Sequence, residues 1–442
     1  MTTNHIRLDR KTVPGAPCAL LWDESLLWGL MAWRALRSAG LPFDLLRAQD
    51  IRGGALSRYR MIFVPGGWAS NKLSALGEGG TEAVRRFVEA GGGYLGICGG
   101  AGLATEGGLG LLPVRRRSPR ERVPSFSGPI RLACGRHPVW RGIDAPVFSA
   151  WWPSQFQVED RRVRVLARYE EAQAGAFSSD IDVADGAEIG WPDLERSYGI
   201  LLDPARLCGE PAVVAGRFGR GRVVLSLVHF DTPGDRNGAV VLGDLWRHLA
   251  SWDPSHGSGE ARVAREVPFP DGSGNIQPVV EEIGTAVAEL IAVGARNFLW
   301  YWRTPLLLQW RRGVRGLEYA TLAVMIGEIE RRLAPDASTP EGRSAIPRSV
   351  DPGILEGQLA EIREELLPFV EKAKRLLVGE RFSLLRGPLS PLDCADPEIG
   401  RLREELFGGA MSHGGRFKSL IGRVDRVLYG LLRDQAALSG PE

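Results

Sequence analysis

The sequence is poor in the side chains that build disulfide frameworks and clustered metal sites. Its 442 residues contain five cysteines and six histidines, and no two cysteines form a CxxC pair. The cysteines are scattered along the chain as Cys18, Cys98, Cys134, Cys208 and Cys394. An odd number of widely spaced thiols argues against a disulfide-stabilised scaffold and indicates a reducing compartment. We expect neither a metal ion nor a bound cofactor.

Long apolar runs and a strong charge bias are absent as well. Residues 1–15 lack the apolar segment of a signal peptide, and we expect a short tail there. The most apolar stretch, 297–310, is interrupted by Arg303 and Pro305 and is shorter than the roughly 20 residues that cross a membrane. A formal net charge of +2 does not favour nucleic acid as a partner. These features predict a cytoplasmic protein without a transmembrane segment.

Residues 16–252 alternate short apolar runs with helix-type patterns, which is typical of an α/β sheet. Continuous apolar runs are expected of parallel strands that are buried on both faces. The predicted early strands are 18–22, 43–47, 61–67 and 93–97, and the predicted helices are 25–40 and 81–92. Later strands are predicted near 128–134, 146–150, 163–168, 211–218 and 222–228, with a hairpin turn at 219–221 and a closing helix at 236–252.

The remainder of the chain has a different pattern. Residues 253–277 are rich in Pro, Gly and Ser and predict a linker. Beyond this segment, apolar residues recur at helical spacing within 280–291, 355–366 and 417–431. We therefore predict a separate all-helical bundle domain over 278–438.

One cysteine lies in a stretch whose glycine pattern suggests chemistry. Residues 91–105 read GGGYLGICGGAGLAT, which places Cys98 between the predicted strand 93–97 and a following helix. The spacing Gly96-x-Cys98-x-Gly100 is that of a nucleophile elbow, a sharp strand-to-helix turn that presents a reactive side chain. Glycines permit the strained backbone and leave room for it. Glycine-rich turns also bind phosphate, and buried cysteines are often structural, so this stretch alone leaves those interpretations open.

A base and a carboxylate for this thiol occur later in the same region. A cysteine nucleophile needs a general base and a group that orients the base. The segment VVLSLVHFDTPGD places His229 at a strand end and Asp231 two residues later. Both would lie at the carboxyl edge of the sheet, which also carries Cys98. The other histidines occupy less suitable positions, in the tail, in turns, in the linker and in helical segments: His5, His137, His248, His256 and His413.

Backbone donors are expected beside Cys98. The predicted strand 61–67 ends in FVPGG, and its neighbour in the expected strand order ends at Cys98. The N–H groups of Gly66 and Gly67, together with that of Gly99, could point at a developing oxyanion. The simpler interpretation of FVPGG is a tight turn.

Taken in this order, the motifs FVPGG, GICGG and HFD resemble the class I glutamine amidotransferase-like superfamily. They correspond to its oxyanion strand, its nucleophile elbow and its usual His-Pro-Glu. The segments HPVWRGI and FGRGRVVLSLVHF also resemble that superfamily, and the most similar branch is the biotin–protein ligase N-terminal-like group. The resemblance covers residues 16–252 and implies a flavodoxin-like α/β fold, with a mostly parallel sheet and helices on both faces. It also implies a triad of Cys98 as nucleophile, His229 as base and Asp231 as orienting group.

Some features depart from the superfamily pattern. Asp231 stands where glutamate is customary, and Phe230 replaces the usual proline. We find no P-loop, no synthetase signature and no biotin ligase catalytic module. One hypothesis is a cysteine-dependent amidase or hydrolase acting on a small-molecule amide or acyl substrate. The other is a non-catalytic ligand- or partner-binding module, with the helical domain as its protein-interaction element.

Two arginine-rich segments remain. Residues 296–316 interleave aromatic residues with arginines, and we expect core tryptophans beside a solvated face rather than an interfacial or partner-binding stripe. The segment RRRSPRER, 115–122, could attract phosphates, but an isolated basic loop is more simply a solvated one.

Overall fold

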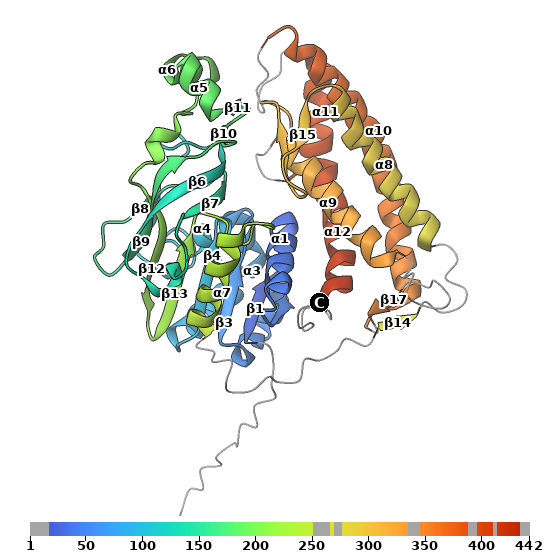
Figure 1. Ribbon diagram of the computed structural model, residues 1–442. Helices are drawn as coiled ribbons and strands as arrows, with labels where there is room; N and C mark the ends of the chain where they lie inside the picture. The colour runs from blue at the N-terminus through green and yellow to red at the C-terminus, as the bar shows by residue number, and fades with distance from the viewer. Residues whose placement is uncertain are drawn as a thin grey trace, which may run out of the picture.

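The computed structural model describes residues 17–250, 266–268, 276–334, 345–347, 349–387, 396–409 and 413–433. An α/β region and a helical region lie side by side (Figure 1). Most of the predicted linker 253–277 and all of the predicted tail 1–15 fall outside the described residues.

The α/β region is built on one mixed 11-stranded sheet, in the order β11-β10-β6-β9-β12-β13-β4-β3-β1-β2, with β7 paired to β6. Strands β2, β1, β3, β4 and β13 are mutually parallel, and the pairings from β13 outward to β11 are antiparallel. The parallel part comprises β1 (Cys18–Leu21), β2 (Phe43–Leu46), β3 (Met61–Val64), β4 (Gly93–Ile97) and β13 (Gly221–Ser226). The antiparallel part comprises β6 (Phe126–Cys134), β7 (Val147–Trp151), β9 (Arg164–Ala172), β10 (Phe177–Ser178), β11 (Ile181–Asp182) and β12 (Pro211–Phe218).

Helices cover the parallel strands, which are almost fully buried, as their continuous apolar sequences require. These helices are α1 (Leu26–Ser38), α2 (Ala48–Arg52), α3 (Ala69–Glu89), α4 (Gly99–Leu103) and α7 (Arg236–Ala250). Smaller elements are η1 (Ala55–Arg58), β5 (Arg115–Arg116), η2 (Pro138–Trp140), β8 (Phe156–Gln157), α5 (Val183–Ile189), α6 (Trp191–Tyr198) and η3 (Pro204–Leu207). The predicted α/β fold with a parallel core is confirmed, and so is the hairpin between β12 and β13.

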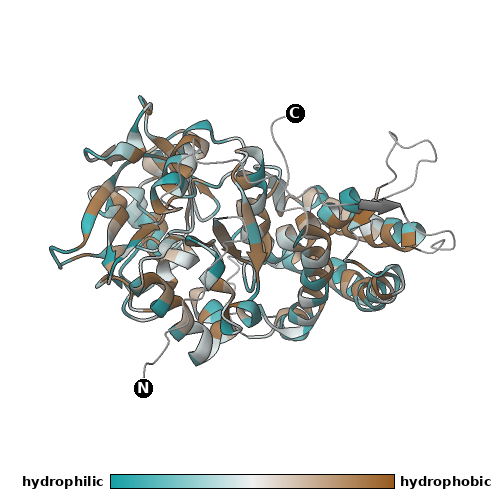
Figure 2. Cartoon of the chain, turned by 90° about the horizontal axis from the view of Figure 1, so that it is seen from below, coloured by the Kyte–Doolittle hydropathy of each residue, from teal (hydrophilic) through white to brown (hydrophobic). Residues whose placement is uncertain are grey.

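The C-terminal region is helical, as predicted. Its helices are α8 (Ile276–Arg296), α9 (Gly316–Leu333), α10 (Pro352–Leu384), α11 (Pro397–Phe407) and α12 (Gly415–Arg433). Hydrophobic and hydrophilic residues alternate along the helices of this region, as expected of helices that bury one face (Figure 2). Two short two-stranded sheets accompany them: β15 (Trp300–Trp302) with β16 (Leu308–Trp310), and β14 (Glu266–Pro268) with β17 (Ala345–Pro347). The strand β14 shows that part of the predicted linker pairs with the helical region.

The helical region contacts the α/β region through buried polar side chains. The indole N–H of Trp22 donates to Asp425 on α12 over 2.7 Å. Arg34 on α1 pairs with the buried Glu328 on α9 over 2.5 Å. These two contacts join the regions, one directly after β1 and the other on α1.

Two departures from the predicted elements matter for the site. Helix α3 begins at Ala69 rather than near 81, and its ladder is interrupted at Gly77, which has φ of 61°. The glycines around residue 77 predict a turn from the sequence, but only Gly77 departs from the helical conformation. The segment 177–207, for which we predicted no element, contains two short strands and three short helices.

Candidate functional site

The candidate site lies where the parallel strands end. Cys98 directly follows β4, and residues 65–67 follow its neighbour β3. Strand β13, on the other side of β4, ends at Ser226, three residues before His229. Because parallel strands present their carboxyl ends at one edge of a sheet, these segments meet there.

Cys98 has the backbone of a strained turn. Its φ of 51° and ψ of −105° lie outside the regions that ordinary residues favour. Its N–H donates to the Ser226 carbonyl over 2.8 Å, and its carbonyl accepts from Gly102 N–H over 2.9 Å, which starts α4. The Sγ atom lies 3.9 Å from the carbonyl oxygen of Trp151, and the residue is partly exposed. Such strain at a reactive side chain is typical of a functional site.

The glycines around Cys98 allow two turns to touch. A Cβ atom on Gly99 would stand 1.8 Å from the carbonyl oxygen of Gly67, and one on Gly100 would stand 1.9 Å from that of Val64. Gly67 itself has φ of 109°, which favours glycine. The structure therefore brings the predicted Gly66–Gly67 turn and Gly99 together at the elbow.

We expect Gly99→Ala to disrupt this contact. The new methyl group would overlap a backbone carbonyl, which cannot move as a flexible side chain can. The free energy of unfolding should fall by at least about 2 kcal/mol, measured by denaturant titration. Gly107→Ala is the matched control, because a Cβ there meets nothing within 4 Å, and it should change stability by less than about 0.5 kcal/mol. Equal stability of the two variants would contradict the described packing.

His229 and Asp231 form a buried pair. Nδ1 of His229 lies 2.9 Å from Oδ1 of Asp231, and neither side chain is exposed. Burial lowers the pKa of His229, but the Asp231 carboxylate and Cys98 outweigh it and raise the pKa to about 9. Among the described residues, Nε2 of His229 and Oδ2 of Asp231 have no hydrogen-bond partner of full geometry. Since Asp231 occupies Nδ1, Nε2 is the ring nitrogen left to face Cys98.

Neighbouring groups fix the orientation of the His229 ring. Its backbone N–H donates to Ser149 over 2.7 Å, and its carbonyl accepts from the Thr232 hydroxyl over 3.0 Å. The ring of Trp28 lies 4.9 Å from the imidazole, centroid to centroid. The backbone hydrogen bonds hold the residue in place, and Trp28 packs against its ring.

Aromatic rings continue from the site to the helical region. Trp152, which has φ of 50°, lies 6.1 Å from Trp28 and 5.0 Å from Trp310, between ring centroids. Trp310 belongs to β16, so the segment 296–316 folds as a hairpin against the α/β region. Of its aromatic residues, Trp300 is buried, whereas Tyr301 and Trp302 are 54% and 42% exposed. The prediction of core tryptophans therefore holds for Trp300 but not for Trp302.

A buried lysine that no sequence motif indicates lies beside the site. Lys72 on α3 is fully buried, and its amine donates to the Ser25 hydroxyl and, over 3.3 Å, to the Asp23 carbonyl. Burial lowers its pKa to about 7, against the opposing charges of Glu24, Asp23, Asp425 and Cys98. Glu24 has φ of 55° and accepts a hydrogen bond from Asn71 over 3.2 Å. No sequence motif indicates these residues. Glu24 lies in a loop, and Lys72 lies in the first part of α3, where the glycines that follow in the sequence suggest a turn rather than a helix.

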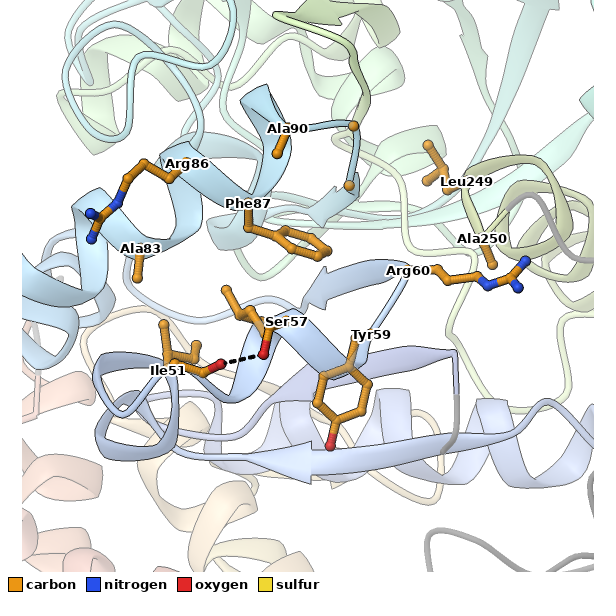
Figure 3. A pocket seen from close by; sticks show the side chains of 14 residues that line it. Ile51, Ser57, Tyr59, Arg60, Ala83, Arg86, Phe87, Ala90, Leu249 and Ala250 are labelled. Atoms are coloured by element: carbon orange, nitrogen blue, oxygen red, sulfur yellow. Dashed lines mark hydrogen bonds between the residues drawn. The ribbon is translucent and has the colours of Figure 1, made fainter. Parts of the chain in front are cut away.

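A separate cavity lies away from this edge. It has a volume of about 600 Å³ and lies between the α2–η1 segment and α3, with Phe87, Tyr59 and Arg60 among its lining residues (Figure 3). Arg60 and Gly92 immediately precede β3 and β4, so this pocket lies at the amino ends of the strands, opposite Cys98. We assign it no part in the chemistry.

Neither a metal-binding cluster nor a membrane span accompanies the site. Across the part of the chain that the structure describes, no three His, Cys, Asp or Glu side chains are grouped to hold a metal ion. The described helices include none with the length and apolar character to cross a membrane.

Comparisons with known proteins give structural matches only. No protein-family model matches the sequence, and no curated protein matches it. Matching solved structures include a protein named as a GMP synthase subunit from Thermoplasma acidophilum, with 13% identity and a TM-score of 0.36, which covers 54% of this chain and 96% of its own. A glutamine amidotransferase matches with 20% identity and a TM-score of 0.34, over 53% of this chain and 100% of its own.

Other matches carry different names. A beta-galactosidase from Bacillus circulans sp. alkalophilus matches with 15% identity and a TM-score of 0.35, over 54% of this chain and 32% of its own. At such identities and TM-scores, none of these matches assigns the chain to a family, and the function must be argued from the site itself.

Proposed function

We propose that the protein is a cysteine-dependent amidase or hydrolase of the class I glutamine amidotransferase-like type, with Cys98, His229 and Asp231 as its triad. The observation that carries this proposal is the thiol on a strained strand-to-helix turn, beside a histidine whose other ring nitrogen is held by a buried carboxylate. A cysteine that served packing alone would need neither the strained backbone nor the buried ion pair.

The proposed reaction is acyl transfer through a thioester. The Cys98 thiolate attacks the carbonyl carbon, the C–S bond forms, and the carbonyl electron pair moves onto oxygen. The N–H groups of Gly66, Gly67 and Gly99 would stabilise that oxyanion. Protonated His229 then donates its proton to the leaving amine as the C–N bond breaks. Water attacks the thioester, His229 accepts its proton, and the thiolate leaves.

Asp231 would hold the imidazole in place and stabilise its protonated form. Its separation of 2.9 Å from Nδ1 indicates that the shorter carboxylate reaches the ring, although glutamate is customary at this position. The motifs in the order FVPGG, GICGG and HFD support the superfamily, as do HPVWRGI and FGRGRVVLSLVHF, and the biotin–protein ligase N-terminal-like group is the branch that we propose.

Alkylation of single thiols tests the nucleophile. At neutral pH we expect iodoacetamide to modify Cys98 at least about tenfold faster than the exposed Cys208, with peptide mass spectrometry as the measurement. His229→Ala should remove this difference, because the histidine no longer supports the thiolate. The substrate would then be sought among amides and γ-glutamyl compounds by release of amine. Faster modification of Cys208, together with no turnover, would favour the non-catalytic binding module.

A further inference from the structure

We propose that Trp28 is a positioning residue of the Cys98 site, which holds the oxyanion turn Gly66–Gly67 and the His229 ring in place relative to each other. In this role its indole acts through these two neighbours and forms no bond with the substrate. This inference rests on the proposed function, since it concerns the base and the oxyanion donors of the same reaction.

The indole of Trp28 contacts both parts of the site. Its ring centroid lies 4.9 Å from that of His229, and the two ring planes are inclined by 35°. A Cβ atom placed on Gly66 would stand 2.9 Å from Cγ of Trp28, so the backbone of the turn lies directly against the same side chain. Trp28 is only 8% exposed. One buried, rigid ring system therefore touches the turn that would bind the oxyanion and the base that would move the proton.

This contact accounts for the first glycine of the FVPGG motif. Gly67 has φ of 109°, so its backbone favours glycine, whereas Gly66 is not among the described glycines with positive φ. A methyl group on Gly66 would instead collide with Cγ and Cβ of Trp28, which are the least mobile atoms of that side chain. Gly66 is therefore required by the tryptophan and not by the conformation of the turn.

Backbone strain accompanies the approach of Trp28 to the site. Glu24 and Leu26 flank Ser25 at the start of α1, and they have φ of 55° and 46°. Of the six non-glycine residues with positive φ in the described part of the chain, four belong to the segments around the nucleophile: these two, Cys98 and Trp152. Such strain persists only where the surrounding structure imposes it, and it gathers at functional sites. The loop that leads to Trp28 thus shares a property of the nucleophile itself.

The buried Lys72 holds this loop against the turn. Its amine donates to the Ser25 hydroxyl and, over 3.3 Å, to the Asp23 carbonyl. The Ser25 carbonyl accepts from Trp28 N–H over 2.9 Å. Cε of the same lysine would stand 3.4 Å from a Cβ on Gly67. Trp28 is therefore supported from behind by a residue that also touches the oxyanion turn, as a precise site requires.

Two probes of Cys98 separate the two contacts. Iodoacetamide reports the thiolate that His229 supports, because the thiolate displaces iodide and no oxyanion forms. With p-nitrophenyl acetate, the thiolate attacks the acetyl carbonyl, a C–S bond forms, and p-nitrophenolate leaves with the electron pair of the C–O bond, so this probe also needs the oxyanion donors. Cys208 in the same molecule is the reference for iodoacetamide, and the Cys98→Ala protein is the blank for p-nitrophenolate release.

Trp28→Leu keeps an apolar side chain but removes the flat ring, so the imidazole and the turn can both shift. We expect the rate ratio of Cys98 to Cys208 with iodoacetamide to fall about threefold, and the rate with p-nitrophenyl acetate to fall about tenfold or more, because the second probe depends on both contacts. Trp28→Phe restores a ring and should stay within about threefold of wild type with either probe.

Trp33→Leu is the matched control for losing a buried tryptophan from the same helix. Trp33 is 2% exposed, and its ring contacts Arg37 and Arg332 rather than the site. This variant should lose stability, as a large-to-small core substitution does, and keep both rates within about twofold of wild type. Equal rate losses in Trp28→Leu and Trp33→Leu would overturn the proposal, because both would then follow stability alone.

A double-mutant cycle tests the contact with the turn. Gly66→Ala alone should slow the reaction with p-nitrophenyl acetate about tenfold, whereas the same change in Trp28→Leu should cost less, because the smaller side chain leaves room for the methyl group. Additive losses would contradict the contact.

Tryptophan fluorescence tests the contact with the base without any reaction. A protonated imidazole quenches an adjacent indole. The difference between wild type and Trp28→Phe should therefore brighten as the pH rises through the raised pKa of His229, about 9, and His229→Ala should lack this step. Absence of the step in wild type would contradict the contact. If wild-type Cys98 outpaces Cys208 but Trp28→Leu changes neither rate, the inference is wrong and the proposed function stands. If wild-type Cys98 reacts no faster than Cys208, the proposed function fails and this role fails with it.

Discussion

Cys98→Ala is expected to abolish turnover of whichever amide the protein cleaves, by a factor of about 10⁴ or more. The thioester cannot form without the sulfur, so no other group of the site replaces it. His229→Ala should leave a slow residual rate, because the oxyanion donors and the thiol remain. Asp231→Asn should do less harm than either change, since it affects only the position and charge of the imidazole. Initial rates of amine release for the three purified variants give the ranking.

The upper limb of the pH–rate profile checks the role of Asp231. His229 has a raised pKa of about 9, so the wild-type rate should fall as the pH rises through that value. Asp231→Asn removes the charge that raises this pKa, and the limb should move to lower pH. Cys134→Ala is the matched control for losing a partly exposed thiol elsewhere in the same region, and it should retain wild-type rates. Full activity in Cys98→Ala would rule out the proposed mechanism.

The strands of the parallel core could be predicted from the sequence because burial on both faces leaves a readable apolar run. Leu20, Phe63 and Leu95, which come from three neighbouring strands, are each fully buried. The elbow was also readable, since its glycines are required by backbone contacts as close as that between Gly99 and Gly67. Because β3 and β4 are parallel neighbours, the turn at Gly66–Gly67 and the turn at Cys98 lie at the same edge of the sheet.

What the sequence did not reveal depends on tertiary contacts. Lys72 lies on α3 before Gly77. The sequence alone does not show whether a helix continues past such a glycine. Arg122 looks like any arginine of a solvated loop, yet its guanidinium donates to the Pro153 carbonyl over 2.8 Å, and the neighbouring Val123 N–H donates to the Gln155 side chain over 2.9 Å. The same holds for Asp425, which lies more than 300 residues from Cys98 along the chain and yet affects the pKa of Lys72.

The contact of α12 gives the helical region a part in the site's environment. Asp425 accepts from Trp22 and pairs with Arg47 over 3.0 Å, and Arg47 also pairs with Asp23 over 2.9 Å. Burial raises the pKa of Asp425 to about 6, and Arg47 opposes that shift. These paired charges connect α12 with the loop that contains Asp23 and Ser25, whose oxygen atoms accept hydrogen bonds from Lys72.

Lys72→Met is expected to change how stability depends on pH. In the unfolded chain the lysine has its ordinary pKa of 10.5, whereas burial lowers the pKa to about 7 in the folded protein. Between these values the unfolded state binds more protons than the folded state, so this lysine makes stability rise as the pH increases from about 7 to 10. The slope contributed by one such group reaches about 1.4 kcal/mol per pH unit. Methionine has a similar shape and no charge, and the variant should lose this slope.

The measurement is the free energy of unfolding in urea at several pH values between 6 and 10, for wild type and variant. His229 contributes in the opposite direction, because its raised pKa gives stability that is lost as the pH rises through about 9. The difference between wild type and Lys72→Met isolates the lysine from that effect. Lys418→Met, which removes an exposed lysine from α12, should leave the slope unchanged. Parallel pH profiles for wild type and Lys72→Met would mean that the Lys72 amine remains charged beside Ser25, contrary to the lowered pKa.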